Sequence, residues 1–208
     1  MIIKIISFRI SYYFYLVLLF ELVVSNNVTS STIHVPEDYS SIQEAIDSAI
    51  NATTILIAPG KYFENIRIQN KNIVLASKSD GQLDTIIDGN QKDSVVYIYN
   101  DFNYKVQISG ISIVNGKSKN FGGGIYCSNG KVIIDNVTIS DNIASLGAGI
   151  YIESDSESII SNSIIKNNYS YHDGGGAYLS TDMIKMIKVM ISNNHASIEH
   201  NYGRGGGI

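Results

Sequence analysis

A glycine-rich phrase that recurs at near-constant spacing is the strongest constraint on the fold of this chain. It appears as Gly122–Tyr126, again as Gly147–Tyr151 and Gly174–Tyr178, and the sequence stops inside a fourth copy at Gly205–Ile208. The interval between copies varies slightly from one copy to the next. Recurrence with a period of roughly 20–50 residues indicates a repeat architecture, in which each repeat packs on its neighbours.

A second phrase lies between the glycine phrases and keeps one invariant step along the chain. It places four isoleucines and three asparagines at Ile113, Ile139, Ile165 and Ile191, and at Asn142, Asn168 and Asn194. One side of each repeat therefore has a fixed length while the other side varies, as in a solenoid of stacked strands. We expect the isoleucines to form an internal ladder. We expect the asparagines to stack at a turn, where asparagine tolerates left-handed backbone geometry.

Short strands separated by turns fill the first half of the chain. The predicted strands are Thr54–Ile57, Asn65–Ile68, Asn72–Leu75, Thr85–Ile87 and Val95–Ile98, with turns at Pro59–Gly60, Asp80–Gly81 and Asp88–Asn90. Such strands also suit a sandwich, but sandwich strands do not repeat in sequence. No helix-length pattern separates the strands, which argues against an α/β fold. The sequence predicts an all-β solenoid of about six three-strand coils.

One amphipathic helix is predicted over Ser40–Ala49. Ser40 with Gln43, or Ser41 with Glu44, forms a capping box at its start. Its apolar residues recur at helical spacing: Ile42, Ala45, Ile46 and Ala49. A stacked coil exposes core and unpaired strand edges at its open end, so we expect this helix to cap the first coil.

The opening segment, 1–25, resembles a secretion signal. Lys4 and Arg9 give a basic start, Tyr12–Phe20 is a short apolar run, and Val23–Ser25 offers small residues for cleavage. An uncleaved membrane anchor is the alternative, although the run is short for a bilayer span. We expect an exported protein that is secreted or displayed on the cell surface, or in the outer membrane if the source is a Gram-negative bacterium.

The expected domain organisation has three parts. Residues 1–25 form the signal peptide, 26–53 the first strand and capping helix, and 54–208 the solenoid. Because Gly205–Ile208 opens a coil without completing it, we expect the chain to be a fragment. If it truly ends at Ile208, we expect end-to-end self-association through the uncapped coil.

In an exported protein, Asn-x-Ser/Thr triplets are acceptor sites for N-linked glycans. They begin at Asn27, Asn51, Asn136 and Asn168. Asn168 belongs to the asparagine ladder, where its side chain should be occupied, so we expect no glycan there. The sequence does not decide whether Asn27, Asn51 and Asn136 carry glycans.

Charge and cysteine content narrow the classes of partner. The net charge is −4, and removal of residues 1–25 leaves 13 basic and 18 acidic side chains, a net charge of −5. A nucleic-acid binder normally carries a basic patch, and the sequence shows none. Cys127 is the single cysteine and alternates with Tyr126 in a strand pattern, which predicts a buried, unreactive thiol.

Three segments carry a resemblance to a known family: Ser41–Ile46, Ile57–Ile66 and Thr85–Gly89. Through them, residues 33–90 resemble the opening of the pectin-lyase-like right-handed parallel β-helices, especially of the pectinesterase type. Residues 113–208 are similar to the Gly-Gly-Ala-Ile and Asn-containing repeats of polymorphic outer-membrane and related surface β-helix proteins. The resemblance covers most of the chain after the signal segment and implies a right-handed parallel β-helix.

The resemblance also implies where catalysis would lie, in a groove along one sheet. Pectinesterase-like catalysis needs two carboxylates and an arginine, but the family's Gln-Asp-Thr and Asp-Phe-Ile-Phe-Gly phrases do not occur here. The Gly-His-Gly and Arg-Ile-Lys phrases of polygalacturonases are also missing. Pectate-lyase-like elimination needs a calcium ion and an arginine base, and neither Arg67 nor Arg204 lies near an acid cluster. No catalytic residue is carried over.

Three tyrosines in equivalent repeat positions form the main candidate site: Tyr126, Tyr151 and Tyr178. If the residues before them face inward, the rings stack on the outside and suit the apolar faces of sugars. The alternative is a stabilising aromatic ladder beneath a loop.

Two weaker candidates involve titratable groups. Glu153, Asp155 and Glu157 alternate, which in a strand would place three carboxylates on one face for calcium. The alternative is a solvated loop. His172 and Asp173 would make an acid–base pair, but adjacent residues in an extended chain point opposite ways, so we favour a loop there too.

The leading hypothesis is an exported, non-catalytic scaffold that binds carbohydrate or a cell-surface partner along its side, with no cofactor unless calcium binds. A polysaccharide-active enzyme whose catalytic coils are missing is the first alternative, of the polyuronate lyase, hydrolase or esterase type. A structural repeat segment of a larger adhesin is the second, since fold alone does not decide function.

Overall fold

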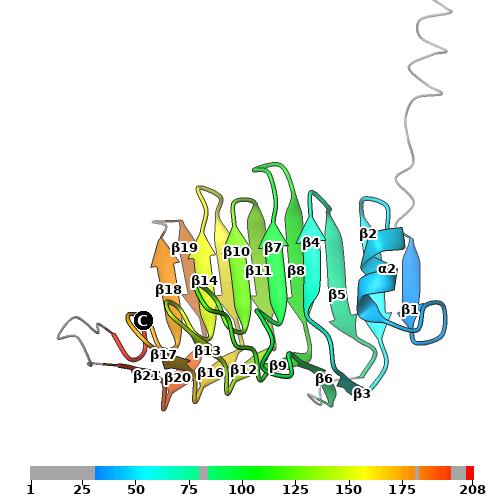
Figure 1. Ribbon diagram of the computed structural model, residues 1–208. Helices are drawn as coiled ribbons and strands as arrows, with labels where there is room; N and C mark the ends of the chain where they lie inside the picture. Colours follow the sequence, from blue (N-terminus) through cyan, green and yellow to red (C-terminus); the bar gives the residue numbers. More distant parts are fainter. Residues whose placement is uncertain (1–30, 80–83, 181–182, 198–204) are drawn as a thin grey trace, which may run out of the picture.

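The computed structural model describes residues 31–79, 84–180, 183–197 and 205–208, which form a right-handed parallel β-helix of about six coils (Figure 1). The proposed signal segment, Asn27 and the turn at Asp80–Gly81 lie outside the described residues. Among the helices of the described part, none is long and apolar enough to cross a membrane. The predicted fold class is confirmed.

Three sheets run along the solenoid, and every strand pair in the described chain is parallel. Sheet A contains β1 (Thr32–Val35), β2 (Thr53–Ile57), β5 (Ile73–Ser77), β8 (Lys105–Ser109), β11 (Lys131–Asp135), β15 (Ser158–Ser161) and β19 (Ile184–Ile187). Sheet B contains β3 (Gly60–Tyr62), β6 (Thr85–Asp88), β9 (Ile111–Val114), β12 (Thr138–Ser140), β16 (Ile164–Lys166) and β20 (Met190–Ser192). Sheet C contains β4 (Ile66–Gln69), β7 (Val96–Tyr99), β10 (Ile125–Ser128), β14 (Ile150–Glu153) and β18 (Ala177–Ser180).

A small fourth sheet, D, fills the corner between sheets B and C. Its strands are β13 (Ile143–Ala144), β17 (Tyr169–Ser170) and β21 (His195–Ala196). The sequence did not predict it, because such short strands give no alternating pattern that could be recognised. β3 was likewise not predicted: its first residue, Gly60, was placed in the turn Pro59–Gly60, and Gly60 and Lys61 give no apolar signal.

The core consists of columns of apolar side chains that run along the solenoid axis. Alternate residues of each strand point inward, so one position repeats from coil to coil. Ile113, Ile139 and Ile165 face one another in sheet B and are fully buried, and Ile191 continues the column half-buried. Cys127 is also fully buried, and burial raises the pKa of its thiol to about 12, as expected of an unreactive cysteine.

The asparagine ladder is built from repeated side-chain hydrogen bonds. Asn142 Nδ2 donates to Ile113 O (3.2 Å), and the Asn142 backbone N–H donates to Asn168 Oδ1 (3.0 Å). One coil further on, Asn168 Nδ2 donates to Ile139 O (3.1 Å), and the Asn168 backbone N–H donates to Asn194 Oδ1 (3.0 Å). The buried Asn168 amide is thus occupied within the fold, which leaves no free nitrogen there for a glycan.

The left-handed residues of these turns are not the ladder asparagines themselves, so that expectation is wrong. Positive φ angles belong to the residues before them, Asp141 (61°), Asn167 (56°) and Asn193 (55°). The left-handed residue turns the chain so that the next side chain points into the solenoid. Gly116 takes the ladder position one coil before Asn142 and donates its N–H to Asn142 Oδ1 (2.7 Å). A Cβ on Gly116 would lie 1.8 Å from Gly123 O, so no side chain fits.

The predicted helix is present as α2 (Ile42–Ser48), with Ser41 as its N-cap. Ser41 Oγ accepts a hydrogen bond from the Glu44 N–H (3.2 Å), which satisfies a backbone donor of the first turn. Ile42 and Ile46 are buried against the end of the solenoid. α2 lies between β1 and β2, where later coils carry a sheet C strand, and it packs against β4 (Figure 1).

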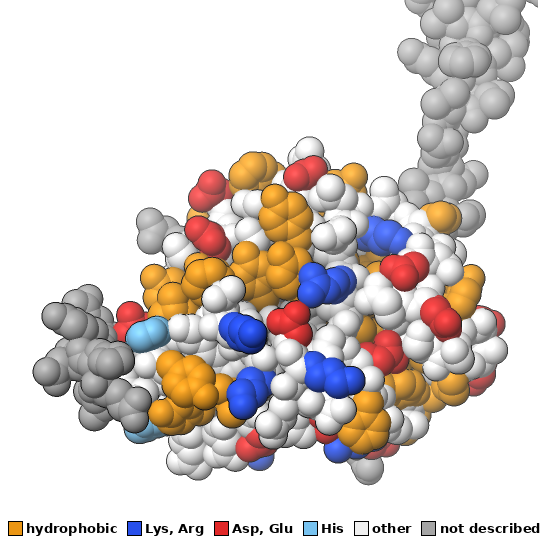
Figure 2. Space-filling view, in the orientation of Figure 1, with side chains coloured by type: hydrophobic (Ala, Val, Ile, Leu, Met, Phe, Trp, Pro, Cys, Tyr) orange, Lys and Arg blue, Asp and Glu red, His pale blue; other side chains and the backbone are white. Residues whose placement is uncertain are grey.

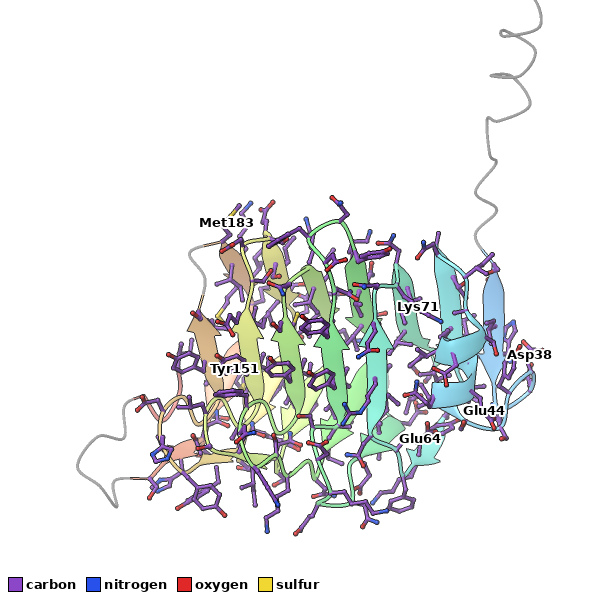
Figure 3. All side chains as sticks on the ribbon, turned by 45° about the horizontal axis from the view of Figure 1, so that its top comes forward. Asp38, Glu44, Glu64, Lys71, Tyr151 and Met183 are labelled. Carbon is purple, nitrogen blue, oxygen red and sulfur yellow. The ribbon has the colours of Figure 1, made fainter. Side chains whose placement is uncertain are left out.

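Side chains from the next coil hold both ends of α2. The Glu64 carboxylate accepts from the N–H groups of Ile42 (2.9 Å) and Gln43 (3.0 Å), beside the positive end of the helix dipole. Lys71 Nζ donates to Ile46 O (2.6 Å) and to two further carbonyls at the other end. Figure 3 shows Glu64 and Lys71 at opposite ends of the helix. These bonds fix the cap on the solenoid.

Candidate functional site

The outward face of sheet C carries two rows of side chains in strand register. One row is Arg67, Tyr97, Tyr126, Tyr151 and Tyr178, and the other is Gln69, Tyr99, Ser128, Glu153 and Ser180. Figure 2 shows hydrophobic side chains gathered over this sheet, with basic side chains along their border. The three tyrosines singled out in the sequence therefore lie together, in a longer row.

The tyrosine rings stack on one another along the solenoid axis. Ring centroids are 4.8 Å apart for Tyr97 and Tyr126, 5.6 Å for Tyr126 and Tyr151, and 5.2 Å for Tyr151 and Tyr178. The predicted stack is present, and Tyr97 extends it by one coil. The glycine phrase does not precede Tyr97, so the repeat that identified the other three gave no signal for it.

A loop covers the middle of this stack. Phe121, from the β9–β10 connection, lies 4.6 Å from the Tyr151 ring and 6.2 Å from the Tyr126 ring. Tyr151 is only 6% exposed, and burial together with the nearby Glu153 carboxylate raises its pKa to about 12. Because neighbouring rings cover its faces, Tyr151 fits the alternative of an aromatic ladder under a loop better than an open platform.

Among the tyrosines of the two rows, the most exposed one lies towards the end of the sheet near α2. Tyr99 is 47% exposed and lies opposite Gln69 on the neighbouring strand. The Arg67 guanidinium lies over the Tyr97 ring, 4.9 Å from its centroid, and pairs with Asp93 at 3.1 Å. Arginine and tyrosine in this arrangement attract through a cation–π interaction. Arg67 was not predicted from the sequence as a site residue because no acid cluster lies near it along the chain, whereas its partners, Asp93 and Tyr97, come from the next coil.

A polar hollow of about 500 Å³ lies where sheet C meets α2. We call it the corner pocket. It is lined by Gln43, Ile46 and Asp47 of α2 and by Asn65, Arg67, Gln69 and Lys71 of the β4 segment. The amides of Gln43 and Asn65 are engaged by hydrogen bonds within the fold. The Arg67 guanidinium, the Gln69 amide and the Asp47 carboxylate border the hollow near Tyr97 and Tyr99, and such groups can hydrogen-bond neighbouring hydroxyl groups.

The proposed calcium ligands do not come together. β14 ends at Glu153, so Asp155 and Glu157 lie in the connection to β15 and not on the same strand face. Glu157 instead forms an ion pair with Lys185, and Glu153 accepts a hydrogen bond from the Tyr151 hydroxyl (3.4 Å). Across the described ranges, no three His, Cys, Asp or Glu side chains are grouped to hold a metal ion.

His172 and Asp173 lie in the connection between β17 and β18. The Ser170 hydroxyl organises this connection: it accepts from the His172 backbone N–H (3.3 Å) and donates to Asp173 O (2.9 Å). The segment is a loop, which was the favoured alternative.

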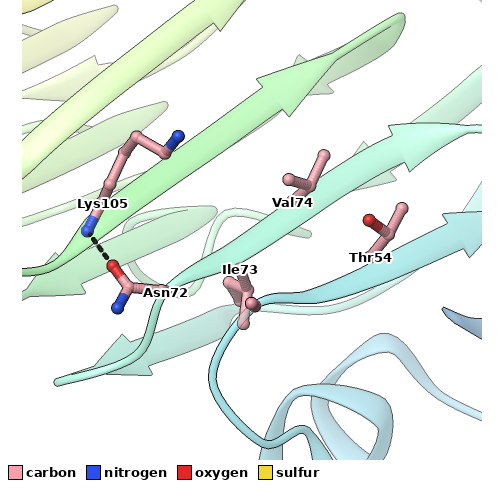
Figure 4. Close-up of a pocket in the computed structure, with 6 residues that line it drawn as sticks. Thr54, Asn72, Ile73, Val74 and Lys105 are labelled. Atoms are coloured by element: carbon pink, nitrogen blue, oxygen red, sulfur yellow. Dashed lines mark hydrogen bonds between the residues drawn. The ribbon is translucent and has the colours of Figure 1, made fainter. Parts of the chain in front are cut away.

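A second hollow, of about 350 Å³, lies on the outer face of sheet A (Figure 4). Thr54 and Val74 form its floor, and Asn72 Oδ1 accepts the Lys105 backbone N–H at 2.8 Å on its border. Lys105 is the one charged side chain among its lining residues, so this hollow offers fewer polar groups than the corner pocket.

Paired-carboxylate chemistry has no place on the outward rows of sheet C. Among these ten positions Glu153 is the single acid, and it lies three strands away from Arg67. Glycoside hydrolysis by the usual two-carboxylate mechanisms needs a second acid within about 5–10 Å. The ten outward positions of sheet C therefore do not contain the acid pair that this mechanism uses.

Comparison with known proteins supports the fold. No family model matches the sequence, and a search of curated proteins finds no match. Among solved structures, the chain is similar to the rice weevil pectin methyl esterase, with a TM-score of 0.52 and 15% identity over 82% of this chain and 66% of that chain. It also matches the Aspergillus niger pectin methylesterase, with a TM-score of 0.44 and 16% identity over 84% of this chain and 69% of that chain. At 15% identity, the likeness to the rice weevil enzyme shows the parallel β-helix fold alone.

Proposed function

We propose that this chain is an exported β-helix protein that binds polysaccharide on the outward face of sheet C without catalysing its breakdown. The observation that carries the proposal is the corner pocket, where polar side chains converge beside Tyr97 and the exposed Tyr99. Sugar sites combine aromatic surface with a few well-placed polar groups in this manner. The similarity to a pectin methyl esterase supports a polysaccharide as the ligand class.

The tyrosine stack takes a supporting role in this proposal. Tyr126, Tyr151 and Tyr178 form the floor that keeps sheet C regular, and their edges border the binding face. Neighbouring rings cover Tyr126 and Tyr151, and Tyr151 covers one side of Tyr178, so we assign contact with the ligand to Tyr99 and the Arg67 side. The outward rows lack a second carboxylate, which favours binding over hydrolysis.

The test is a binding measurement on purified protein. The probes are soluble β-1,4-glucan, β-1,4-xylan, β-1,4-galactan and polygalacturonan, each titrated by calorimetry. We expect at least one polymer to bind and Tyr99→Ala to weaken it. The matched control is Tyr171→Ala, since Tyr171 is 48% exposed, close to the 47% of Tyr99, but lies in the β17–β18 connection. Binding to none of the four polymers, or equal losses in both variants, would contradict the proposal.

A further inference from the structure

The outward face of sheet C is closed at one end. Its five strands span about 19 Å at the usual strand spacing. Beyond β4 the next element is not a strand but α2, whose Gln43 and Asp47 line the corner pocket. Figure 1 shows α2 at this end of the solenoid. A ligand that lies along the sheet therefore meets the helix after Arg67.

The closing element is held rigidly. Glu64 binds the first turn of α2 and Lys71 its last turn, as described above. The Gln43 side chain, which also belongs to the first turn, accepts a hydrogen bond from the Arg67 N–H (2.7 Å) and donates one to the Arg67 carbonyl (3.2 Å). Gln43 Nε2 also donates to Asp47 Oδ1 (2.8 Å), which fixes that carboxylate at the rim of the pocket. Hydrogen bonds at both ends of α2 oppose its displacement by a ligand.

The pocket also presents groups that suit a terminal sugar. An internal sugar uses two positions for glycosidic bonds, whereas a terminal sugar has one more free hydroxyl to satisfy. The Asp47 carboxylate is an acceptor, the Arg67 guanidinium a donor, and the exposed Gln69 amide offers both. All three border the same hollow of about 500 Å³.

We infer that sheet C recognises the end of a polysaccharide chain, with the terminal sugar in the corner pocket and the following sugars directed over Tyr97 and Tyr99 away from α2. This inference rests on the proposed function and adds the mode of recognition. A sheet face open at both ends would accept any internal stretch of the polymer, whereas a face closed at one end by a fixed helix accepts a chain end there.

The decisive experiment asks whether binding depends on the number of chain ends or on the total mass of glycan. Hexasaccharides of the same four glycans are titrated beside their parent polymers at equal mass concentration. Because a hexasaccharide carries many more ends per gram, we expect it to bind at least about tenfold more effectively by mass. A polymer that binds as well as its hexasaccharide by mass would overturn end recognition while leaving polysaccharide binding intact. No binding by either form would overturn both.

A matched pair of variants tests which end of sheet C binds the terminal sugar. Gln69 and Ser180 are exposed positions in the same register row, at opposite ends of sheet C. Gln69→Phe should fill the corner pocket and weaken hexasaccharide binding by about tenfold or more, and Ser180→Phe should leave it within about twofold. The reverse order, or equal effects at thermal stabilities like that of the unsubstituted protein, would overturn the inference.

Discussion

The side chain of Gln43 forms the two backbone hydrogen bonds with Arg67 that a neighbouring β-strand would otherwise form. The Arg67 N–H donates to Gln43 Oε1 at 2.7 Å, and Gln43 Nε2 donates to Arg67 O at 3.2 Å. In later coils a neighbouring strand of sheet C supplies such partners. One amide side chain on a helix thus satisfies part of the first edge of the sheet, the kind of edge that otherwise invites pairing with another chain.

Removal of this amide should destabilise the capped end. Gln43→Ala leaves the Arg67 N–H and carbonyl without these partners, and we expect the free energy of unfolding to fall by about 1–3 kcal/mol. Ser48→Ala, an exposed position on the same helix, should change it by less than about 0.5 kcal/mol. Urea denaturation measures both, and equal midpoints for the two variants would argue against the strand-replacement role.

A substitution in the buried asparagine ladder should lower the free energy of unfolding more than a substitution in the capping helix α2. Asn168→Leu removes the acceptor for the Asn142 N–H and the donor to Ile139 O, and leaves both buried groups unpaired. We expect a loss of about 3 kcal/mol or more in unfolding free energy. Asn120→Ala, at an exposed loop position, is the control. A stable Asn168→Leu protein with an unchanged urea midpoint would show that the ladder is dispensable.

Acid should weaken the fold partly through Asp88. Burial raises the pKa of this carboxyl, but the Lys61 ammonium (2.7 Å), the Asn90 N–H and the Asn115 amide together outweigh it and hold the pKa below its ordinary value of 3.8. Because the folded state then binds the proton less readily than the unfolded state, this stabilisation is present above about pH 4 and is lost as the pH falls through the folded-state pKa. Thermal melting between pH 7 and pH 2 should show a shallower acid decline for Asp88→Asn than for the unsubstituted protein. Parallel curves would count against this role.

The tyrosine stack on the outward face of sheet C should contribute to the stability of the fold. Tyr151→Ala removes a buried ring that contacts Phe121, Tyr126 and Tyr178, and we expect a cost of about 3–5 kcal/mol. Tyr151→Phe keeps the ring and should cost less than about 1.5 kcal/mol. If Tyr151→Ala folds normally and loses only glycan binding, the ring acts as an open platform instead.

Calcium should have no effect on stability. Glu153 and Asp155 are exposed, Glu157 pairs with Lys185, and the three are not grouped around a common site. The melting temperature in millimolar calcium should therefore equal that in excess EDTA. A rise with calcium that is absent in Glu153→Gln would restore the ion-binding hypothesis for this segment.

The repeat spacing was sufficient to predict the solenoid, because the strand register follows the constant step of the isoleucines and places Ile139 against Ile113 and Ile165. The helix was predictable from its cap and apolar spacing. The corner pocket was not, since Gln43 and Arg67 meet through a contact that no later coil repeats. Phe121 was missed for a related reason: it belongs to a connection whose residues lie outside the strand pattern, so periodicity gives no information on where its ring lies.

The corner that bears Phe121 separates two differently constrained parts of each coil. On one side the hydrogen bonds of the asparagine ladder hold the backbone in place. On the other side the strand pairing of sheet C, which aligns the tyrosines, holds it in place again. Mutations that lengthen or shorten the residues between them need not disturb either, since loop insertions are cheap in free energy. Natural selection can therefore alter the loop that covers the outward face of sheet C, and with it any preference of the proposed binding site, while the inherited scaffold stays the same.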